Sequence, residues 1–198
     1  MMVLGKISSG MVTAAVIAAG LGQPAWAQPQ SPESDAPPTE ECGQVIGVLN
    51  STVEVMEDFK AEIRQFTQEA AAVNDLADLR RAATRYVNAV DAVVLDLDAV
   101  DSKLLGLTLE DLGLIDLRDN HARIIRGVAQ AMNDAGAAMD PLTMVTSETE
   151  LPAMIEQSQM DTVVAIRSIE TYSAQEAESV EEINAYCGVE TQTLEPRE

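Results

Sequence analysis

Hydrophobic residues recur at steps of three and four along four long stretches of the chain. The first runs from Cys42 to Val73, the second from Leu76 to Leu104, the third from Leu114 to Ala138 and the fourth from Ile155 to Cys187. Residues at these steps share one face of an α-helix, so each stretch predicts one amphipathic helix. In the second stretch the steps alternate without a break, which is typical of a coiled-coil-like seam.

Local signals place the ends of these helices. Starts are predicted at Thr39, at Asn74 or Asp75, within Thr108–Asp111 and near Thr149. Pro152 belongs in a first turn, and Gly106 and Gly188 are typical helix stops. The predicted buried stripe of the fourth helix comprises Ile155, Met160, Val163, Ile166, Ile169, Ser173, Ala177, Val180, Ile183 and Cys187.

A longer connection is expected between the third and fourth helices. The stretch from Asn133 to Pro152 contains Gly136, Pro141 and several Ser and Thr residues, which favour a helix end followed by a loop. Its apolar members Met139, Leu142 and Met144 are expected to lie on the bundle, because an exposed apolar loop would be a liability.

Four helices, each with one apolar stripe, predict an all-α fold over residues 40–188. The other connections are short, which favours antiparallel neighbours. The predicted architecture is therefore an antiparallel up-down-up-down four-helix bundle.

The two cysteines agree with this topology. Cys42 lies at the start of the first predicted helix and Cys187 at the end of the last, so the bundle places both at the same end. In an oxidising compartment they would form a disulfide. A catalytic redox pair is the alternative, but such pairs usually lie close together as Cys-x-x-Cys.

The residues around these cysteines resemble a family. Cys42 begins the first helix, and Glu182-Ile183-Asn184-Ala185-Tyr186-Cys187 ends the last. The chain is similar to a group of small exported helical proteins, mostly cyanobacterial, with one Cys near the mature N-terminus and an Asn-x-Tyr-Cys near the C-terminus. That group has no assigned activity, so the resemblance implies a fold and a compartment only.

Residues 1–27 have the order of a cleavable signal peptide. Lys6 precedes an apolar stretch from Met11 to Leu21, and Ala25-Trp26-Ala27 supplies the small residues of a cleavage site before Gln28. The apolar stretch is shorter than the about 20 residues that a membrane anchor needs. The mature protein is therefore expected in the periplasm or outside the cell, with no stable membrane anchor after cleavage.

Two further segments are expected to be disordered. Residues 28–39 are rich in Pro, Ser and acids and have little to bury, and residues 189–198 form an acidic tail without periodicity.

Charge limits the choice of partner. The chain has a formal net charge of −21, and so negative a protein repels phosphate backbones and anionic lipids. Nucleic acid is excluded as a partner. The acids themselves are interpreted as a solvated surface that keeps the protein soluble.

His121 is the one histidine, and it falls on the apolar stripe of the third helix. A metal ligand or general base is the sharper interpretation. A single His offers no cluster, however, and Arg118 stands where a Glu-x-x-His motif would place its Glu. A packed, hydrogen-bonded His is therefore favoured. His121, Arg118 and Tyr86 are kept as a ligand site, which a cavity lined by them would support.

Other clusters have plainer interpretations. The acids Asp96, Asp98 and Asp101 lack the pattern of an EF-hand loop. The sequence could form an anion site from Arg118, Arg123 and Arg126, although ordinary ion pairs are favoured. A thioether copper site would draw on Met132, Met139, Met144, Met154 and Met160, but no tight Met-x-x-Met repeat is present.

The sequence predicts no catalytic residue, no metal site and no cofactor. It predicts an exported, non-catalytic bundle with a binding or structural role in the cell envelope, whose partner is a protein or small ligand. The alternative is a periplasmic small-ligand or metal carrier that uses His121, Arg or Met residues. Self-association through the seam of the second helix stays open.

Overall fold

The structure, a computed structural model, describes residues 40–189. Over this range it consists of four α-helices: α2 (Glu40–Ala71), α3 (Leu76–Leu105), α4 (Leu112–Thr143) and α5 (Leu151–Tyr186). The predictions for the signal peptide 1–27, for the segment 28–39 with its Thr39 cap, and for the tail beyond Val189 lie outside the described residues.

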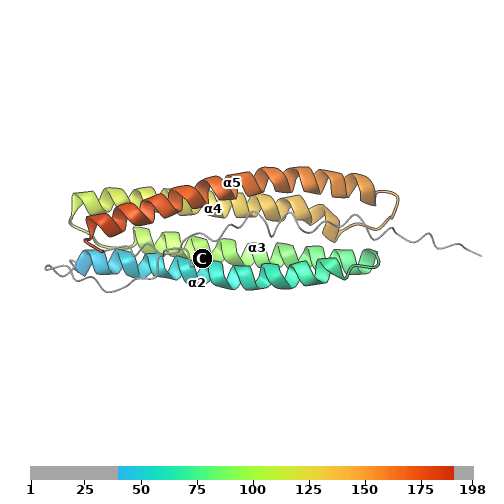
Figure 1. Cartoon of the computed structure of the whole chain (residues 1–198), viewed down its shortest axis with the longest axis horizontal. Coiled ribbons are helices and arrows are strands. Elements are labelled where there is room, and N and C mark those ends of the chain that lie inside the picture. Colours follow the sequence, from blue (N-terminus) through green and yellow to red (C-terminus); the bar gives the residue numbers. More distant parts are fainter. Residues whose placement is uncertain (1–39, 190–198) are drawn as a thin grey trace, which may run out of the picture.

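The four helices run antiparallel along one long axis (Figure 1). The α2–α3 and α4–α5 connections lie at one end, and the α3–α4 connection lies at the other. Helix α4 packs closely against both α3 and α5, and α2 packs against α3. The predicted antiparallel up-down-up-down bundle is confirmed. The backbones of α2 and α5 make far fewer close approaches than the other neighbouring pairs.

The predicted helix ends are largely confirmed. Asp75 and Asp111 are N-caps, and each side chain accepts the backbone N–H three residues on, at 2.8 and 2.9 Å. Gly106 caps α3, and Pro152 lies in the first turn of α5. Gly188 adopts a φ of 68° directly after the last helix, a conformation that glycine adopts without strain.

The prediction that the third helix ends within Asn133–Pro152 and is followed by a longer connection is confirmed, because α4 continues to Thr143 and α5 begins at Leu151. Gly136 faces the bundle, where even an added Cβ would come within 3.0 Å of Val90, so a side chain of minimal size allows α3 and α4 to approach closely. Pro141 falls in the last turn, where it lacks the N–H that would donate to the carbonyl oxygen of Ala137, and α4 ends two residues later. Met144 lies in the connection with 68% of its surface exposed, contrary to the expectation that it packs on the bundle.

The buried face of α5 also differs from the predicted stripe. Met160 and Val163 of that stripe are exposed. The side chains of α5 that the bundle buries are instead largely small or polar: Ser158, Thr162, Ala165, Ile169, Glu176, Ser179, Ile183 and Asn184. Helix α5 therefore buries a polar stripe and leaves part of its apolar residues on the outside.

The hydrophobic core is divided into two clusters. The larger one includes Phe59, Phe66, Tyr86, Leu97 and Ile125 and extends toward the end with the α4–α5 connection. The smaller one, here called the disulfide-end cluster, includes Cys42, Val45, Leu104, Leu114 and Ile183. Both clusters draw residues from all four helices, so burial of apolar surface stabilises the bundle along its whole length.

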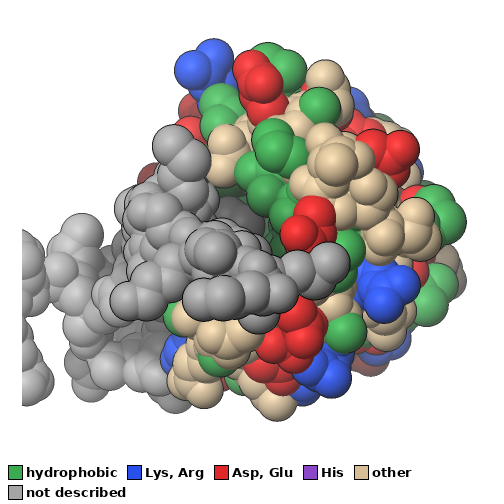
Figure 2. Space-filling view, turned by 90° about the vertical axis from the view of Figure 1, so that its right-hand side faces the viewer, with side chains coloured by type: hydrophobic (Ala, Val, Ile, Leu, Met, Phe, Trp, Pro, Cys, Tyr) green, Lys and Arg blue, Asp and Glu red, His purple; other side chains and the backbone are tan. Residues whose placement is uncertain are grey.

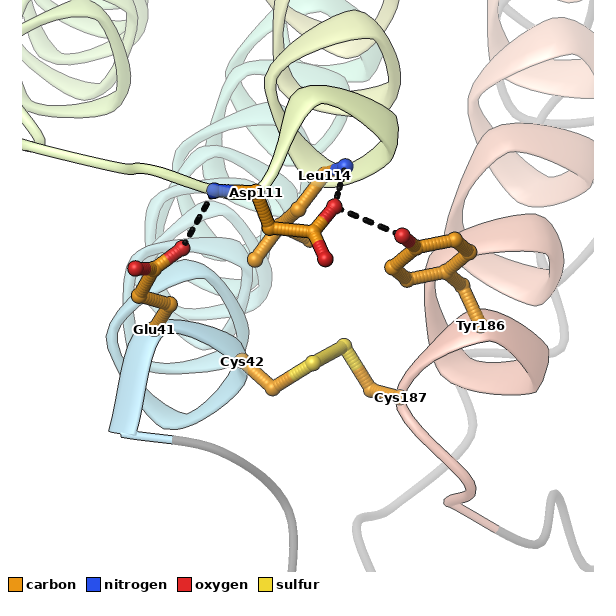
Figure 3. Close-up of a disulfide and its surroundings, with 6 residues drawn as sticks. All are labelled: Glu41, Cys42, Asp111, Leu114, Tyr186 and Cys187. Carbon is orange, nitrogen blue, oxygen red and sulfur yellow. Dashed lines mark hydrogen bonds between the residues drawn. A yellow bond between two sulfur atoms is a disulfide. The ribbon is translucent and has the colours of Figure 1, made fainter.

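The predicted disulfide is present between Cys42 and Cys187, whose Cα atoms lie 5.7 Å apart. It joins the first turn of α2 to the end of α5 (Figure 3). Beside it the ring of Tyr186 lies so close to Gly113 that a Cβ there would overlap it. This end of the bundle is therefore closed by a covalent bond and by packing that requires a glycine.

Among residues 40–189, no helix is both long and apolar enough to cross a membrane. At the end of the bundle opposite the disulfide, the part of the surface formed by described residues displays acidic side chains with hydrophobic and basic ones between them (Figure 2).

Candidate functional site

His121 lies fully buried in α4, with 0% of its surface exposed. Its Nδ1 atom is 3.2 Å from the hydroxyl oxygen of Ser179 on α5. Burial lowers the pKa of His121 to about 4, so the ring is neutral at physiological pH. The other ring nitrogen, Nε2, has no hydrogen-bond partner among the described residues.

Glu176 lies one turn from Ser179 on the same buried face of α5. Only 3% of its surface is exposed, and within residues 40–189 its Oε1 atom has no hydrogen-bond partner. Burial raises the pKa of Glu176 to about 7, because the charged form is poorly solvated inside the bundle. Sequence reasoning missed this residue, since nothing distinguishes one Glu among many on an acidic helix.

Thr52 on α2 lies at the same height as these groups. It is ten residues along α2 from Cys42, and Ser179 is eight residues back along α5 from Cys187. At about 1.5 Å per residue, both lie about 12–15 Å from the disulfide. The Thr52 hydroxyl is also buried and unpartnered among the described atoms.

We call Thr52, His121, Glu176 and Ser179 the polar layer. It falls at the boundary between the two hydrophobic clusters, which contain none of the four. Buried polar atoms without a protein partner usually bind internal water. The layer contains a neutral imidazole and a carboxyl group whose pKa lies near 7. Both groups are buried, so a substrate cannot reach them.

Tyr86 and Arg118 do not join His121 in one site. The Tyr86 ring packs against Phe66 at a centroid distance of 5.0 Å, and burial raises the pKa of Tyr86 to about 12. Arg118 donates to the carbonyl oxygen of Leu107 at 3.1 Å and pairs with Asp119. The predicted ligand-binding triad therefore has three separate surroundings.

The three arginines of α4 also have different partners. Arg126 forms an ion pair with Asp101 at 2.7 Å, and Arg118 forms its pair with Asp119 at the same distance. Arg123 instead donates to the side-chain oxygen of Asn120 at 2.8 Å. In the described part of the chain no carboxylate lies within ion-pairing distance of Arg123.

Arg123 lines a surface groove between α4 and α5. The groove has a volume of about 480 Å³ and is lined by Arg123, Val164, Arg167, Ser168, Thr171, Tyr172 and Gln175. Arg167 likewise has no ion pair within residues 40–189. Tyr172 lies directly over Gly127 of α4, where a Cβ would overlap its ring. We call this feature the arginine groove.

A second groove, between α2 and α3, provides a contrast. It has a volume of about 600 Å³ and includes Arg81 and Arg85 in its lining. Arg85 pairs with Glu69 at 2.7 Å and with Glu62 at 3.5 Å, and Arg81 pairs with Asp78. Its positive charges are neutralised by carboxylates of the protein, whereas those of the arginine groove are not.

The other sequence candidates do not gather into sites. Of the three acids, Asp101 is held by Arg126, whereas Asp96 and Asp98 lie exposed. Met132 is buried in the larger cluster while Met160 is 53% exposed. Over the described range no three His, Cys, Asp or Glu residues come together as a metal site.

Comparison of the chain with family models, with characterised proteins and with solved structures finds no match.

Proposed function

We propose that this protein is an exported, non-catalytic binding protein that takes an anionic ligand in the arginine groove. One observation carries the proposal. Arg123 and Arg167 line the same groove, and neither has an ion pair within residues 40–189, although the chain has 33 acidic residues and only 12 Lys and Arg.

The physical argument concerns the two like charges. Of the eight arginines within residues 40–189, four pair with a carboxylate: Arg81, Arg85, Arg118 and Arg126. Among the other four, Arg123 and Arg167 are distinguished because they line one groove together. Two unpaired guanidinium groups in one groove repel each other unless an anion lies between them. A carboxylate or phosphate would accept charge-assisted hydrogen bonds from both, which are the stronger kind in proteins.

The remaining lining suits a polar anion. Gln175 adds an amide group that can donate to ligand oxygens, and Tyr172 adds a ring. The hydroxyls of Ser168 and Thr171 also line the groove but donate to the backbone carbonyl oxygens of Val164 and Arg167, at 3.4 and 2.8 Å. The groove is open to solvent, so exchange of a ligand needs no opening of the core. Export is supported by the pattern of residues 1–27 and by a disulfide that suits an oxidising compartment.

The test is titration with a small anion of known charge. Citrate is added to the disulfide-bonded protein, and binding is followed by calorimetry and by NMR shifts of the groove residues. We expect saturable binding that weakens with salt and is lost in the double variant Arg123→Gln/Arg167→Gln. Both residues are exposed, so the variant is expected to keep its fold.

The matched control is Arg64→Gln, because Arg64 is exposed on α2 and lies outside the groove. It removes one positive charge without touching Arg123 or Arg167 and should leave binding intact. Absence of binding in the parent protein, or equal binding in the double variant, refutes the proposal.

A further inference from the structure

An exposed stripe on α5 continues the arginine groove along the bundle. It comprises Met160, Val164, Arg167 and Thr171, at steps of four, three and four. Met160 is 53% exposed and Val164 is 64% exposed. This spacing is the one by which a helix presents a seam to another helix.

None of the neighbouring helices covers this stripe. The face of α5 that α2, α3 and α4 bury carries Ser158, Thr162, Ala165 and Ile169 instead. The stripe is apolar at Met160 and Val164 and becomes basic at Arg167, where Arg123 of α4 joins it. One continuous surface therefore offers both apolar contact and positive charge.

We propose that the natural ligand of the arginine groove is an acidic amphipathic helix of a partner protein. This inference rests on the proposed function, because it identifies which kind of anionic ligand the arginine groove binds. Apolar residues of the partner helix would pack on Met160 and Val164. Its carboxylates, one or two turns further along, would pair with Arg167 and Arg123.

The size and the character of the surface favour a helix over a small anion. From Met160 to Thr171 the stripe rises about 16 Å, which corresponds to about three helical turns. A small anion would contact only the arginines and leave Met160 and Val164 in water. An amphipathic helix contacts such a surface through side chains at positions i, i+3, i+4 and i+7.

Charge argues against a second copy of the chain as the occupant. Two molecules that each carry a net charge of −21 repel one another. At physiological salt, charges are screened beyond about 8 Å, so a short acidic helix is influenced mainly by the arginines that it contacts. A single helix of moderate charge is therefore the better match.

The experiment uses a synthetic helical peptide with the full-length, disulfide-bonded protein. The peptide has about three heptads, with Leu along one narrow stripe and Glu beside its C-terminal half. A second peptide carries Lys in place of each Glu. Binding is measured by fluorescence anisotropy, and we expect the acidic peptide alone to bind saturably.

Variants separate the apolar contact from the charge. Val164→Ser and Arg167→Gln should each weaken peptide binding by roughly tenfold, because a few central residues supply most of the binding energy of such a contact. Leu95→Ser, a change of a 69%-exposed residue on α3, is the matched control and should not alter the affinity. Met160→Ser should weaken peptide binding but leave citrate binding unchanged, because Met160 lies on the stripe and outside the lining of the groove.

The outcomes distinguish this inference from the proposed function. Citrate binding without peptide binding overturns the helix partner and leaves an anion-binding protein. Equal binding of acidic and basic peptides, or no effect of Val164→Ser, also overturns it. Concentration-dependent dimers that Arg167→Gln abolishes would identify a second copy as the occupant instead. Failure of both ligands removes the proposed function as well.

Discussion

Tyr186 donates a hydrogen bond of 2.6 Å from its hydroxyl to Oδ1 of Asp111, the residue that caps the N-terminus of α4. The same carboxylate oxygen accepts the backbone N–H of Leu114, and the Asp111 N–H is in turn bound by Glu41 of α2 (Figure 3). The Tyr186 hydroxyl and the Leu114 N–H both hold the pKa of Asp111 below its usual range. Three helix ends therefore meet at Asp111 beside the disulfide: α4 and α5 at its carboxylate and α2 at its backbone N–H.

Replacing Tyr186 with Phe should raise the pKa of Asp111 toward its ordinary value. The variant removes the hydroxyl that stabilises the charged carboxylate and keeps the ring that lies over Gly113. The measurement is an NMR titration of the Asp111 carboxyl carbon. Leu112→Ser, at an exposed neighbour, is the control. An unchanged Asp111 pKa in the Phe variant would show that the hydroxyl is not bound there.

The double variant Cys42→Ser/Cys187→Ser should lower the thermal midpoint while the helical circular dichroism signal stays the same. The bridge closes a loop of 145 residues, for which chain entropy alone predicts about 5 kcal/mol, and measured gains are often smaller. For a domain of this size we expect a fall of roughly 10 °C. An equal midpoint under non-reducing conditions would mean that the bridge does not stabilise the fold.

The free energy of unfolding of the parent protein should fall as the pH rises to neutral and above, and Glu176→Gln should remove that fall. Because burial raises the pKa of Glu176 from 4.5 to about 7, the folded protein binds this proton more tightly than the unfolded chain. Its contribution is complete below pH 4.5 and is lost as the pH rises through 7, by about 3 kcal/mol in all. Urea unfolding from pH 4 to pH 8 should show no such decline in the variant.

The free energy of unfolding of the parent protein should also fall as the pH drops into the acid range, and His121→Leu should remove that fall. Burial lowers the pKa of His121 from 6.5 to about 4, so its contribution is complete above pH 6.5 and is lost as the pH falls through 4. Leucine has no titratable group, so this loss of stability at low pH disappears. The Ser179 hydroxyl loses its partner, which offsets the gain by about 1 kcal/mol. Loss of a bound ligand with the fold intact would contradict a purely structural role.

The two variants serve as controls for each other. Between pH 4.5 and 6.5 the contributions of Glu176 and His121 change in opposite directions, so the parent protein should show a flat maximum there. As the pH increases over this range, the free energy of unfolding should rise in Glu176→Gln, where only His121 titrates. It should fall in His121→Leu, where only Glu176 titrates. A parent curve that matches either variant would locate the titration in another group.

The sequence predicted the bundle because its signals agree with one another. The seam from Leu76 to Leu104 is buried along most of its length, and the caps at Asp75 and Asp111 lie where the pattern places them. The disulfide followed from the topology, since the first and last helices of such a bundle share an end. Local propensity, periodicity and connectivity each pointed to the same fold.

The face of α5 could not be predicted in the same way. Val163 and Val164 are as apolar as the residues that the bundle buries, so hydrophobicity alone favours the wrong side of the helix. The spacing of Met160, Val164, Arg167 and Thr171 was a readable signal of a second stripe. Arg167 became a candidate only when the structure placed it beside Arg123 of another helix.

The polar layer was harder still to foresee. His121 is conspicuous as a lone histidine, but Thr52 and Glu176 are ordinary residues of helices that contain many like them. They are distinguished only by their position along the bundle axis. That position depends on how the disulfide and the caps fix the axial register of the four helices. The hydrophobic pattern of a sequence does not give the axial register between helices that are distant in the chain. The resemblance to exported proteins with an Asn-x-Tyr-Cys ending stays an expectation.

The bridge between Cys42 and Cys187 turns nearly the whole bundle into a closed covalent ring. A protease that cuts the connection between Thr143 and Leu151 opens the ring but leaves a single molecule, because the two pieces remain tied at the far end. Every helix then keeps its partners at high effective concentration. Separation of the pieces requires a second event, reduction of the bridge. Outside a cell, where proteases are common and reductants scarce, one cut would therefore leave the two pieces joined.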